Sequence, residues 1–220
     1  MVVCTGNYDK GNVPDHKNRE NFKGLACHAQ DFISSDMIAG KKVVVVGSGK
    51  SGIDCAVTGA KYGTECTILS RIRHWPVPRF IGGWVLPWYT YSRFINFTLP
   101  IHYDVTPFAR LMHSILSPIK NLFWKGMETH VKKEFKLSGE RLPKVPLSLE
   151  IGGSVQDHKY RDDVMAGKIK EVKGEIEYFK ENSIVLDNGQ EIETDAVIYA
   201  TGFVKEYDIF DEETTRALDR

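Results

Sequence analysis

Three glycines with a particular spacing are the strongest chemical feature of the sequence: Gly47, Gly49 and Gly52 form a Gly-x-Gly-x-x-Gly pattern. In a dinucleotide-binding turn the first glycine permits the tight turn, the second lets backbone amides approach a pyrophosphate, and the third lets the helix pack against the sheet. The pyrophosphate lies at the helix N-terminus, where unpaired N–H groups favour an anion. The pattern predicts a dinucleotide site. Its expected cofactor-binding residues are Gly47, Ser48, Gly49, Lys50, Ser51 and Gly52.

An ATP-binding P-loop and an ordinary glycine-rich turn are the two other interpretations of this segment. Lys50 and Ser51 after Gly49 resemble the end of a P-loop, but that motif needs a glycine five positions before Gly49, where this chain has Val44. The P-loop interpretation therefore fails. An ordinary turn fits the context less well, because a run of four valines precedes the glycines and a helical pattern follows them.

The residues expected at the end of the next strand indicate which dinucleotide binds. An NAD site usually has Asp or Glu there, about 20 residues after the glycines, to accept a hydrogen bond from the ribose 2′-hydroxyl. This chain has Ser70, Arg71 and Arg73 instead. Because guanidinium groups bind phosphate in a bidentate manner, these residues favour NADP(H). The alternative is that both arginines are solvated loop residues.

Other kinds of catalytic site have little support in the sequence. It contains no Gly-x-Ser-x-Gly elbow, no Cys-x-x-Cys pair and no His-Glu-x-x-His spacing, so no metal site is expected and no catalytic residue is assigned. Asp54 is expected to lie on the helix or near the cofactor rather than to act as a base. The difficult chemistry would then come from cofactors that the protein positions.

The composition is typical of a soluble globular protein that does not bind nucleic acid. Hydrophobic residues make up 42% of the 220 residues, and basic and acidic residues both number 29, whereas proteins that coat nucleic acid usually have a basic excess. The most apolar long stretch, residues 81–101, contains Pro87, Arg93 and Pro100, which argues against a transmembrane segment. Four cysteines without a regular framework favour free thiols and a cytoplasmic location.

The elements that would position the glycines predict an α/β fold. Val43–Val46 are four β-branched residues without alternation, which is typical of a strand buried on both faces of a parallel sheet. A helical pattern and a second short strand, Thr64–Leu69, follow. Three strand-like segments come later: Lys168–Phe179, Ser183–Asp187 and Gln190–Thr194. With a hairpin turn at Asn188–Gly189 and a buried strand at Asp195–Ala200, they predict a Rossmann-like domain that contains a β-meander.

An aromatic-rich segment interrupts this pattern. Residues 80–124 hold 11 of the 24 aromatic residues, and prolines at positions 87, 100, 107 and 118 are expected to divide the segment into short helical pieces. Leu122–Phe135 is expected to be helical. Such dense aromatic residues are typical of a protein core or of a lid that covers a substrate channel. The alternative is a docking surface for another protein.

Three motifs in order carry a resemblance to a known family. Phe22, Gly24, His28 and Phe32 form the pattern F-x-G-x-x-x-H-x-x-x-[YF], which precedes the glycine pattern and the later sequence Ala-Thr-Gly-Phe at 200–203. This combination resembles the flavin-containing monooxygenases, a family of class B flavoproteins. Related Baeyer–Villiger enzymes usually have Trp in place of Phe32, so the branch that oxygenates nitrogen or sulfur is favoured. Alternatively, Phe22 and Phe32 are apolar anchors of a packed linker.

The resemblance implies an NADPH- and FAD-dependent monooxygenase. In that family reduced flavin and O₂ give a C4a-hydroperoxyflavin, which passes one oxygen to a soft nucleophilic small molecule. His28 would be structural or cofactor-orienting, and Thr201, Gly202, Thr5 and Gly6 would be further cofactor-binding residues. The implied division is a partial FAD-domain segment and connector at residues 1–35, an NADP-binding domain at 36–203, and the start of a return into the FAD domain at 204–220.

One motif of the family has no counterpart in this sequence, namely the first Gly-x-Gly-x-x-Gly, which holds the FAD pyrophosphate. The chain therefore resembles the NADP-binding domain with partial FAD-domain segments at both ends, and we expect that by itself it does not retain FAD. The alternative function is a non-catalytic NADP-binding module that has lost FAD binding.

Overall fold

The structure is a computed structural model, which describes residues 8–78, 80–81, 84–85, 92, 98–99, 105–150, 155–156 and 158–204, with the backbone alone at 80–81, 84–85 and 155. The α-helices and short 3-10 helices (η) are η1 (Arg19–Asn21), η2 (Ser35–Met37), α1 (Lys50–Tyr62), α4 (Pro107–Ile115), α5 (Ser117–Glu134), η3 (Gly139–Arg141), η4 (Leu147–Leu149) and α6 (His158–Met165). The strands are β1 (Leu25–His28), β2 (Lys42–Val46), β3 (Glu65–Ser70), β4 (Val77–Pro78), β5 (Phe80–Ile81), β6 (Trp84–Val85), β7 (Val155–Gln156), β8 (Ile169–Lys173), β9 (Ile176–Phe179), β10 (Ser183–Leu186), β11 (Glu191–Glu193) and β12 (Ala196–Tyr199).

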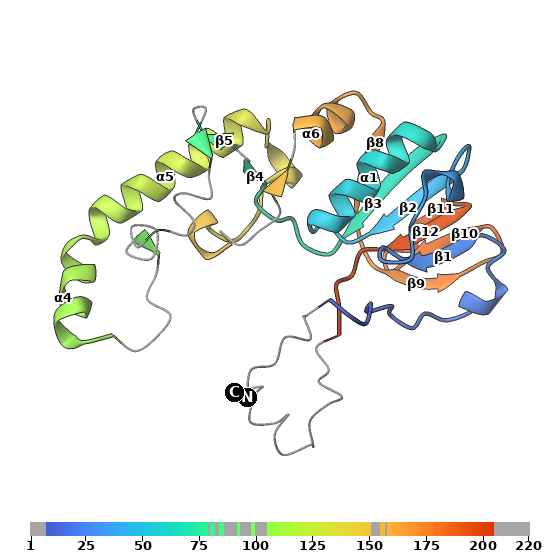
Figure 1. The fold of residues 1–220 in the computed structure, drawn as a ribbon, viewed down its shortest axis with the longest axis horizontal. Coiled ribbons are helices and arrows are strands. Elements are labelled where there is room, and N and C mark those ends of the chain that lie inside the picture. The colour runs from blue at the N-terminus through green and yellow to red at the C-terminus, as the bar shows by residue number, and fades with distance from the viewer. Residues whose placement is uncertain are drawn as a thin grey trace, which may run out of the picture.

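A five-stranded parallel sheet, in the order β1-β12-β2-β3-β8, forms the centre of the fold (Figure 1). The valine run forms β2, the middle strand, and Val43, Val44 and Val45 are at most 2% exposed. The prediction of a strand buried on both faces is therefore confirmed. It holds because a central parallel strand has neighbours at both edges and a packed layer on each face.

Alternate side chains of β2 enter two different cores. Val43 and Val45 pack with Ile53 of α1 and Tyr160 of α6, on the helical face of the sheet. Val44 packs with the strands of the antiparallel sheet β11-β10-β9, which covers the other face. These three layers confirm the predicted Rossmann-like α/β fold with a β-meander.

The long strand-like segment Lys168–Phe179 is divided in the structure, which differs from the prediction. Gly174, with a φ of 158°, separates β8, the edge of the parallel sheet, from β9, the first strand of the meander. Glycine adopts this backbone angle without the penalty that a Cβ would bring. The predicted hairpin turn at Asn188–Gly189 is confirmed between β10 and β11, where Gly189 has a φ of 80° and its N–H donates to the Leu186 carbonyl.

Strand β1 is an element that the sequence analysis does not predict. Leu25–His28 pair in parallel with Ala196–Tyr199, so this short segment extends the sheet beyond β12. The sheet thus crosses the expected boundary between residues 35 and 36, and the division into 1–35, 36–203 and 204–220 stays a prediction.

Helices α4 and α5 form an arm that extends away from the parallel sheet (Figure 1). Each begins with a proline in its first turn, Pro107 and Pro118, in agreement with the expected breaks. The predicted helix at 122–135 corresponds to most of α5, but α5 has 18 residues and is longer than the short pieces expected. The expected breaks at Pro87 and Pro100 lie outside the described residues. Within the described part of the chain, no helix is long and apolar enough to cross a membrane.

Candidate dinucleotide-binding site

The glycine turn lies at the carboxyl end of β2, between the ends of β3 and β12. The Gly47 N–H donates to the Leu69 carbonyl of β3 at 2.8 Å, and Gly47 has a φ of 110°. A Cβ on Gly47 would lie 2.4 Å from the Ala200 carbonyl oxygen. This position therefore requires glycine both for its backbone angle and for its contact with the segment after β12.

Gly52 and Gly49 differ in what surrounds them. A Cβ on Gly52, in the first turn of α1, would lie 2.0 Å from the Gly47 carbonyl oxygen, so only glycine allows the helix to begin so close to the strand. A Cβ on Gly49 would meet no atom of the described residues within 4 Å, apart from its own neighbours along the chain. The fold therefore explains two of the three glycines, and the space in front of the third is open.

The N-terminus of α1 offers hydrogen-bond donors toward this open space. Gly49 is the N-cap residue and, having no side chain, provides no cap. The N–H groups of the first turn, at Lys50, Ser51 and Gly52, have no partners within a helix. Together with the helix dipole, they form an anion-binding position.

The polar side chains of the turn have partners within the protein. The Ser48 hydroxyl donates to the Ile72 carbonyl at 3.4 Å, and this bond connects the turn to the segment after β3. The Lys50 ammonium pairs with the carboxylate of Asp54, one helical turn away, and both side chains are more than half exposed. Asp54 thus lies on the helix surface beside Lys50, as the sequence indicated.

The two arginines after β3 occupy different environments. The Arg73 side chain is 17% exposed, and its Nη1 donates to the Ser70 hydroxyl at 3.3 Å. The Arg71 side chain is 75% exposed, and its Nε lies 4.0 Å from Glu175 Oε1. The structure therefore brings Ser70 and Arg73 together and leaves Arg71 on the surface.

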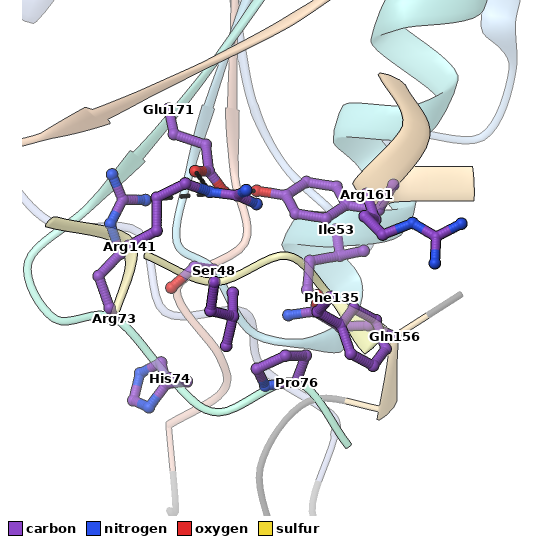
Figure 2. Close-up of a pocket in the computed structure, with 12 residues that line it drawn as sticks. Ser48, Ile53, Arg73, His74, Pro76, Phe135, Arg141, Gln156, Arg161 and Glu171 are labelled. Atoms are coloured by element: carbon purple, nitrogen blue, oxygen red, sulfur yellow. Dashed lines mark hydrogen bonds and ion pairs between the residues drawn. The ribbon is translucent and has the colours of Figure 1, made fainter. Parts of the chain in front are cut away.

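A pocket beside the glycine turn contains Ser48 and Arg73 but not Arg71 (Figure 2). Its described lining residues come from the glycine turn, α1, β7, α6, β8 and the segments after β3 and α5: Ser48, Ile53, Arg73, His74, Pro76, Phe135, Leu137, Arg141, Gln156, Tyr160, Arg161 and Glu171. Sequence reasoning missed Arg141, Tyr160 and Glu171, because no local pattern connects these distant positions to the glycines.

Glu171 links several of these side chains. It accepts hydrogen bonds from the Tyr160 hydroxyl at 2.8 Å and from Arg141 Nε at 2.8 Å. Burial, and secondarily the neighbouring Glu171 carboxylate, raise the pKa of Tyr160 well above its usual range. Tyr160 therefore stays protonated and remains a hydrogen-bond donor to Glu171 at neutral pH.

Thr201 and Gly202, predicted as cofactor-binding residues, follow β12 and contact the N-terminal segment. The Thr201 hydroxyl donates to the Asn12 carbonyl, and the Gly202 carbonyl accepts from the Asn12 N–H at 2.9 Å. His28 Nε2 lies 2.9 Å from the same Gly202 carbonyl, while its Nδ1 accepts from the Gln30 N–H. Both ring nitrogens of His28 are thus engaged with the backbone, which agrees with a structural role.

Two predicted site residues, Thr5 and Gly6, lie outside the described residues. Among the residues that the structure does describe, no group of His, Cys, Asp and Glu side chains could hold a metal ion. Burial raises the pKa of the Cys55 thiol to about 11 and that of Cys66 to about 12. These two thiols stay protonated at neutral pH and do not form a reactive site.

The parallel sheet, the glycine turn at the carboxyl end of its middle strand and the helix that follows define a Rossmann-type nucleotide-binding fold. All of the chain, residues 1–220, matches the model of the FMO-like family, described as flavin-binding monooxygenase-like. The chain belongs to this family, as the motifs indicated.

A relative and two solved structures show how much of a complete family member the chain represents. A probable flavin-containing monooxygenase 1 of Arabidopsis thaliana is 30% identical over 241 residues, an alignment that covers 92% of this chain and 42% of that protein. The open crystal structure of cyclohexanone monooxygenase matches with a TM-score of 0.63 and 14% identity, and covers 91% of this chain and 47% of that one. The OTEMO complex with FAD and NADP matches with a TM-score of 0.60 and 18% identity, and covers 90% and 46%. The chain spans about two-fifths of the length of the curated relatives it matches.

Proposed function

We propose that this chain is the NADP(H)-binding part of an NADPH- and FAD-dependent monooxygenase. Membership of the FMO-like family supports the proposal, as does the likeness in fold to OTEMO, whose structure contains FAD and NADP. The observation that carries it is the open space at Gly49, where a Cβ would meet none of the described residues within 4 Å except its chain neighbours, although Gly47 and Gly52 are tightly confined.

The residues of the turn fit a dinucleotide pyrophosphate. Gly49 lets a phosphate approach the backbone, and the uncapped first turn of α1 supplies N–H donors and a favourable dipole. Ser48 would lie beside the phosphates, and Ser70, Arg71 and Arg73 would bind the ribose 2′-phosphate. Binding an anion with backbone N–H groups requires no side-chain base. No catalytic residue is assigned in this chain.

The chain's own residues would bind and orient the nicotinamide cofactor. When bound, NADPH supplies a hydride and FAD supplies the reaction with O₂. We propose a small molecule with a soft nitrogen or sulfur atom as the oxygen acceptor, because position 32 is Phe, where the related Baeyer–Villiger enzymes usually have Trp. The proposed division is an NADP-binding domain at residues 36–203, flanked by parts of the FAD domain at 1–35 and 204–220. A cofactor contact of Thr201, Gly202, Thr5 and Gly6 belongs to this proposal.

A titration of the chain with NADPH and with NADH tests the nucleotide assignment. We expect tighter binding of NADPH, because each charge-assisted hydrogen bond to the 2′-phosphate contributes about 1.5–3 kcal/mol. Equal affinities for the two dinucleotides would contradict the proposal.

A second measurement separates the proposed enzyme from a non-catalytic NADP-binding module. NADPH oxidation by the chain is followed with and without added FAD. Oxidation that depends on added FAD supports a role in the monooxygenase reaction, whereas tight NADPH binding without any FAD-dependent oxidation favours the module. Because the sequence has a single Gly-x-Gly-x-x-Gly, we expect the purified chain to carry no stoichiometric flavin, and flavin that copurifies with it would contradict that expectation.

A further inference from the structure

Four side chains form a partly buried charged cluster in the pocket beside the glycine turn: Arg73, Arg141, Tyr160 and Glu171 (Figure 2). Glu171 Oε2 accepts from Arg141 Nε at 2.8 Å, and Oε1 accepts from the Tyr160 hydroxyl at 2.8 Å. Arg73 Nη1 lies 4.0 Å from the same Oε1. One carboxylate, itself 13% exposed, therefore holds two guanidinium groups in fixed positions.

The charges of this cluster do not balance. Among the residues that the structure describes, Glu171 is the only carboxylate within 4.0 Å of either Arg73 or Arg141. Arg161, a third guanidinium that lines the pocket, pairs with Asp162. One positive charge thus remains in a partly shielded pocket, where a charge is costly unless an anion compensates it.

The place of the cluster in the fold indicates which anion would fit. Arg73 donates to Ser70 at the end of β3, the position where a Rossmann-type fold recognises the substituent on the ribose 2′-carbon. Ser48 of the glycine turn lies in the same pocket. A pair of guanidinium groups matches the oxygens of a phosphomonoester, with planar forks of N–H donors.

We propose that Arg73 and Arg141, held in place by Glu171 and Tyr160, form a preorganised phosphomonoester subsite that selects the 2′-phosphate of NADP(H). This inference rests on the proposed function and adds Arg141 as a specificity-determining residue, with Glu171 and Tyr160 as positioning residues. Preorganisation matters because arginine side chains that are already fixed lose less conformational entropy when the phosphate binds.

Arg71, the first arginine after β3, has none of these restraints. Its side chain is 75% exposed, is not among the residues that line the pocket, and lies 4.0 Å from Glu175. The larger part of the discrimination is therefore assigned to Arg73 and Arg141.

Calorimetric titration of the 220-residue chain with two probes tests the subsite. Adenosine 2′,5′-bisphosphate and AMP both carry one phosphate at the 5′ end, and only the bisphosphate also carries a phosphate on the ribose 2′-oxygen. Arg73→Gln and Arg141→Gln are each expected to weaken bisphosphate binding by about tenfold or more, the loss of one charge-assisted hydrogen bond, and to leave AMP binding unchanged. Arg110→Gln, an exposed arginine of α4, is the matched control and is expected to change neither affinity.

The outcomes separate failure of the subsite from failure of the proposed function. A parent chain that binds the bisphosphate no better than AMP overturns both. A preference that survives Arg73→Gln and Arg141→Gln but disappears in Arg71→Gln overturns the subsite alone. Loss of affinity for both probes in the Arg73 and Arg141 variants would show a general electrostatic effect and would also overturn it.

A further variant covers the possibility that Arg141→Gln does not fold, because it leaves the Glu171 carboxylate partly buried without its closest partner. Arg141→Lys keeps the positive charge but removes the planar fork. We expect this variant to unfold at nearly the temperature of the parent and to lose most of the preference for the bisphosphate. An unchanged preference in a folded Arg141→Lys variant would exclude Arg141 from the subsite.

Discussion

The loops that follow the neighbouring parallel strands β2 and β12 make different contacts in this fold. The loop after β2, Gly47–Gly52, leads into α1, and among the described residues only the chain neighbours of Gly49 lie within 4 Å of where its Cβ would be. The loop after β12 contains Thr201 and Gly202, and its polar groups bond to Asn12 and His28. Both loops contain a glycine with positive φ at the same edge of the sheet, but only the first continues into an α-helix, whose first-turn N–H groups can bind an anion.

The difference shows that glycine at a strand end has more than one meaning. At Gly47 and Gly52 the protein's own atoms exclude a side chain, whereas at Gly49 nothing in the described structure does. The loop after β12 bonds to the N-terminal segment through the Gly202 carbonyl; space is also open around Gly202, and its φ of 81° is the reason that glycine suits this position. The loop after β2 combines a rigid frame with an open position, which is the arrangement that a pyrophosphate needs.

The largest effect on stability is expected from Gly52→Ala, which disturbs the close contact between the glycine turn and the first turn of α1. Its Cβ would lie 2.0 Å from the Gly47 carbonyl oxygen, so the turn or the helix must shift. We expect the free energy of unfolding to fall by about 3 kcal/mol or more, measured by chemical denaturation. Gly49→Ala makes the same chemical change in open space and should cost less than about 1 kcal/mol, the penalty of alanine at an N-cap. Equal losses in the two variants would contradict the comparison.

His28→Ala removes a side chain that bonds to the loop after β12. His28 is buried and both of its ring nitrogens bond to the backbone, so the substitution leaves a cavity, removes the acceptor of the Gln30 N–H, and leaves the Gly202 carbonyl with its bond from the Asn12 N–H alone. We expect a loss of about 2–3 kcal/mol in the free energy of unfolding. His130→Ala is the control, since His130 is 45% exposed and its pair with Glu134 on α5 should contribute about 0.5 kcal/mol or less.

Gly49→Ala should act on ligand binding where Gly52→Ala acts on stability. A methyl group at the open position would hold a pyrophosphate away from the N–H donors of α1, and losing one such bond weakens binding about tenfold or more. Titration with NADPH measures this effect. If Gly49→Ala bound NADPH as tightly as the parent chain, the open position would have no part in binding.

The smallest effect is expected from pH, and it should act through the segment that holds the loop after β12. Burial lowers the pKa of His16, which stacks on the Tyr199 ring at the end of β12, with Arg19, Asp15 and Glu175 as the charges near it. Below about pH 6.5 the unfolded chain takes up this proton before the folded one does. The free energy of unfolding should therefore decrease as the pH falls through that range. In His16→Phe, thermal unfolding between about pH 7.5 and pH 5.5 should show a smaller decrease, and an identical decrease would exclude His16 as the cause.

Local sequence patterns predicted the elements whose causes are themselves local. Val43–Val46 had to be a buried strand because four β-branched residues without alternation suit a strand covered on both faces. Asn188–Gly189 had to be a turn because its backbone angles favour these residues. By contrast, Leu25–His28 is too short and mixed to announce a strand, and only its pairing with β12 makes it one.

The candidate site shows the same limit. The sequence pointed to Ser70, Arg71 and Arg73 equally, since spacing after the glycines cannot distinguish side chains two residues apart. In the structure Arg73 lines the pocket and Arg71 does not. Glu171 and Arg141, which are distant from Arg73 in the sequence, form the pocket with it.

By itself, then, the sequence determined a β-strand, a three-glycine turn and a helix, because strand burial and glycine stereochemistry depend on neighbours along the chain. The tertiary structure decided which glycine stays open, which loop is fastened by His28, and which arginine is fixed beside a carboxylate. These outcomes depend on contacts between segments far apart in the chain, and a charged side chain takes its final environment from such contacts.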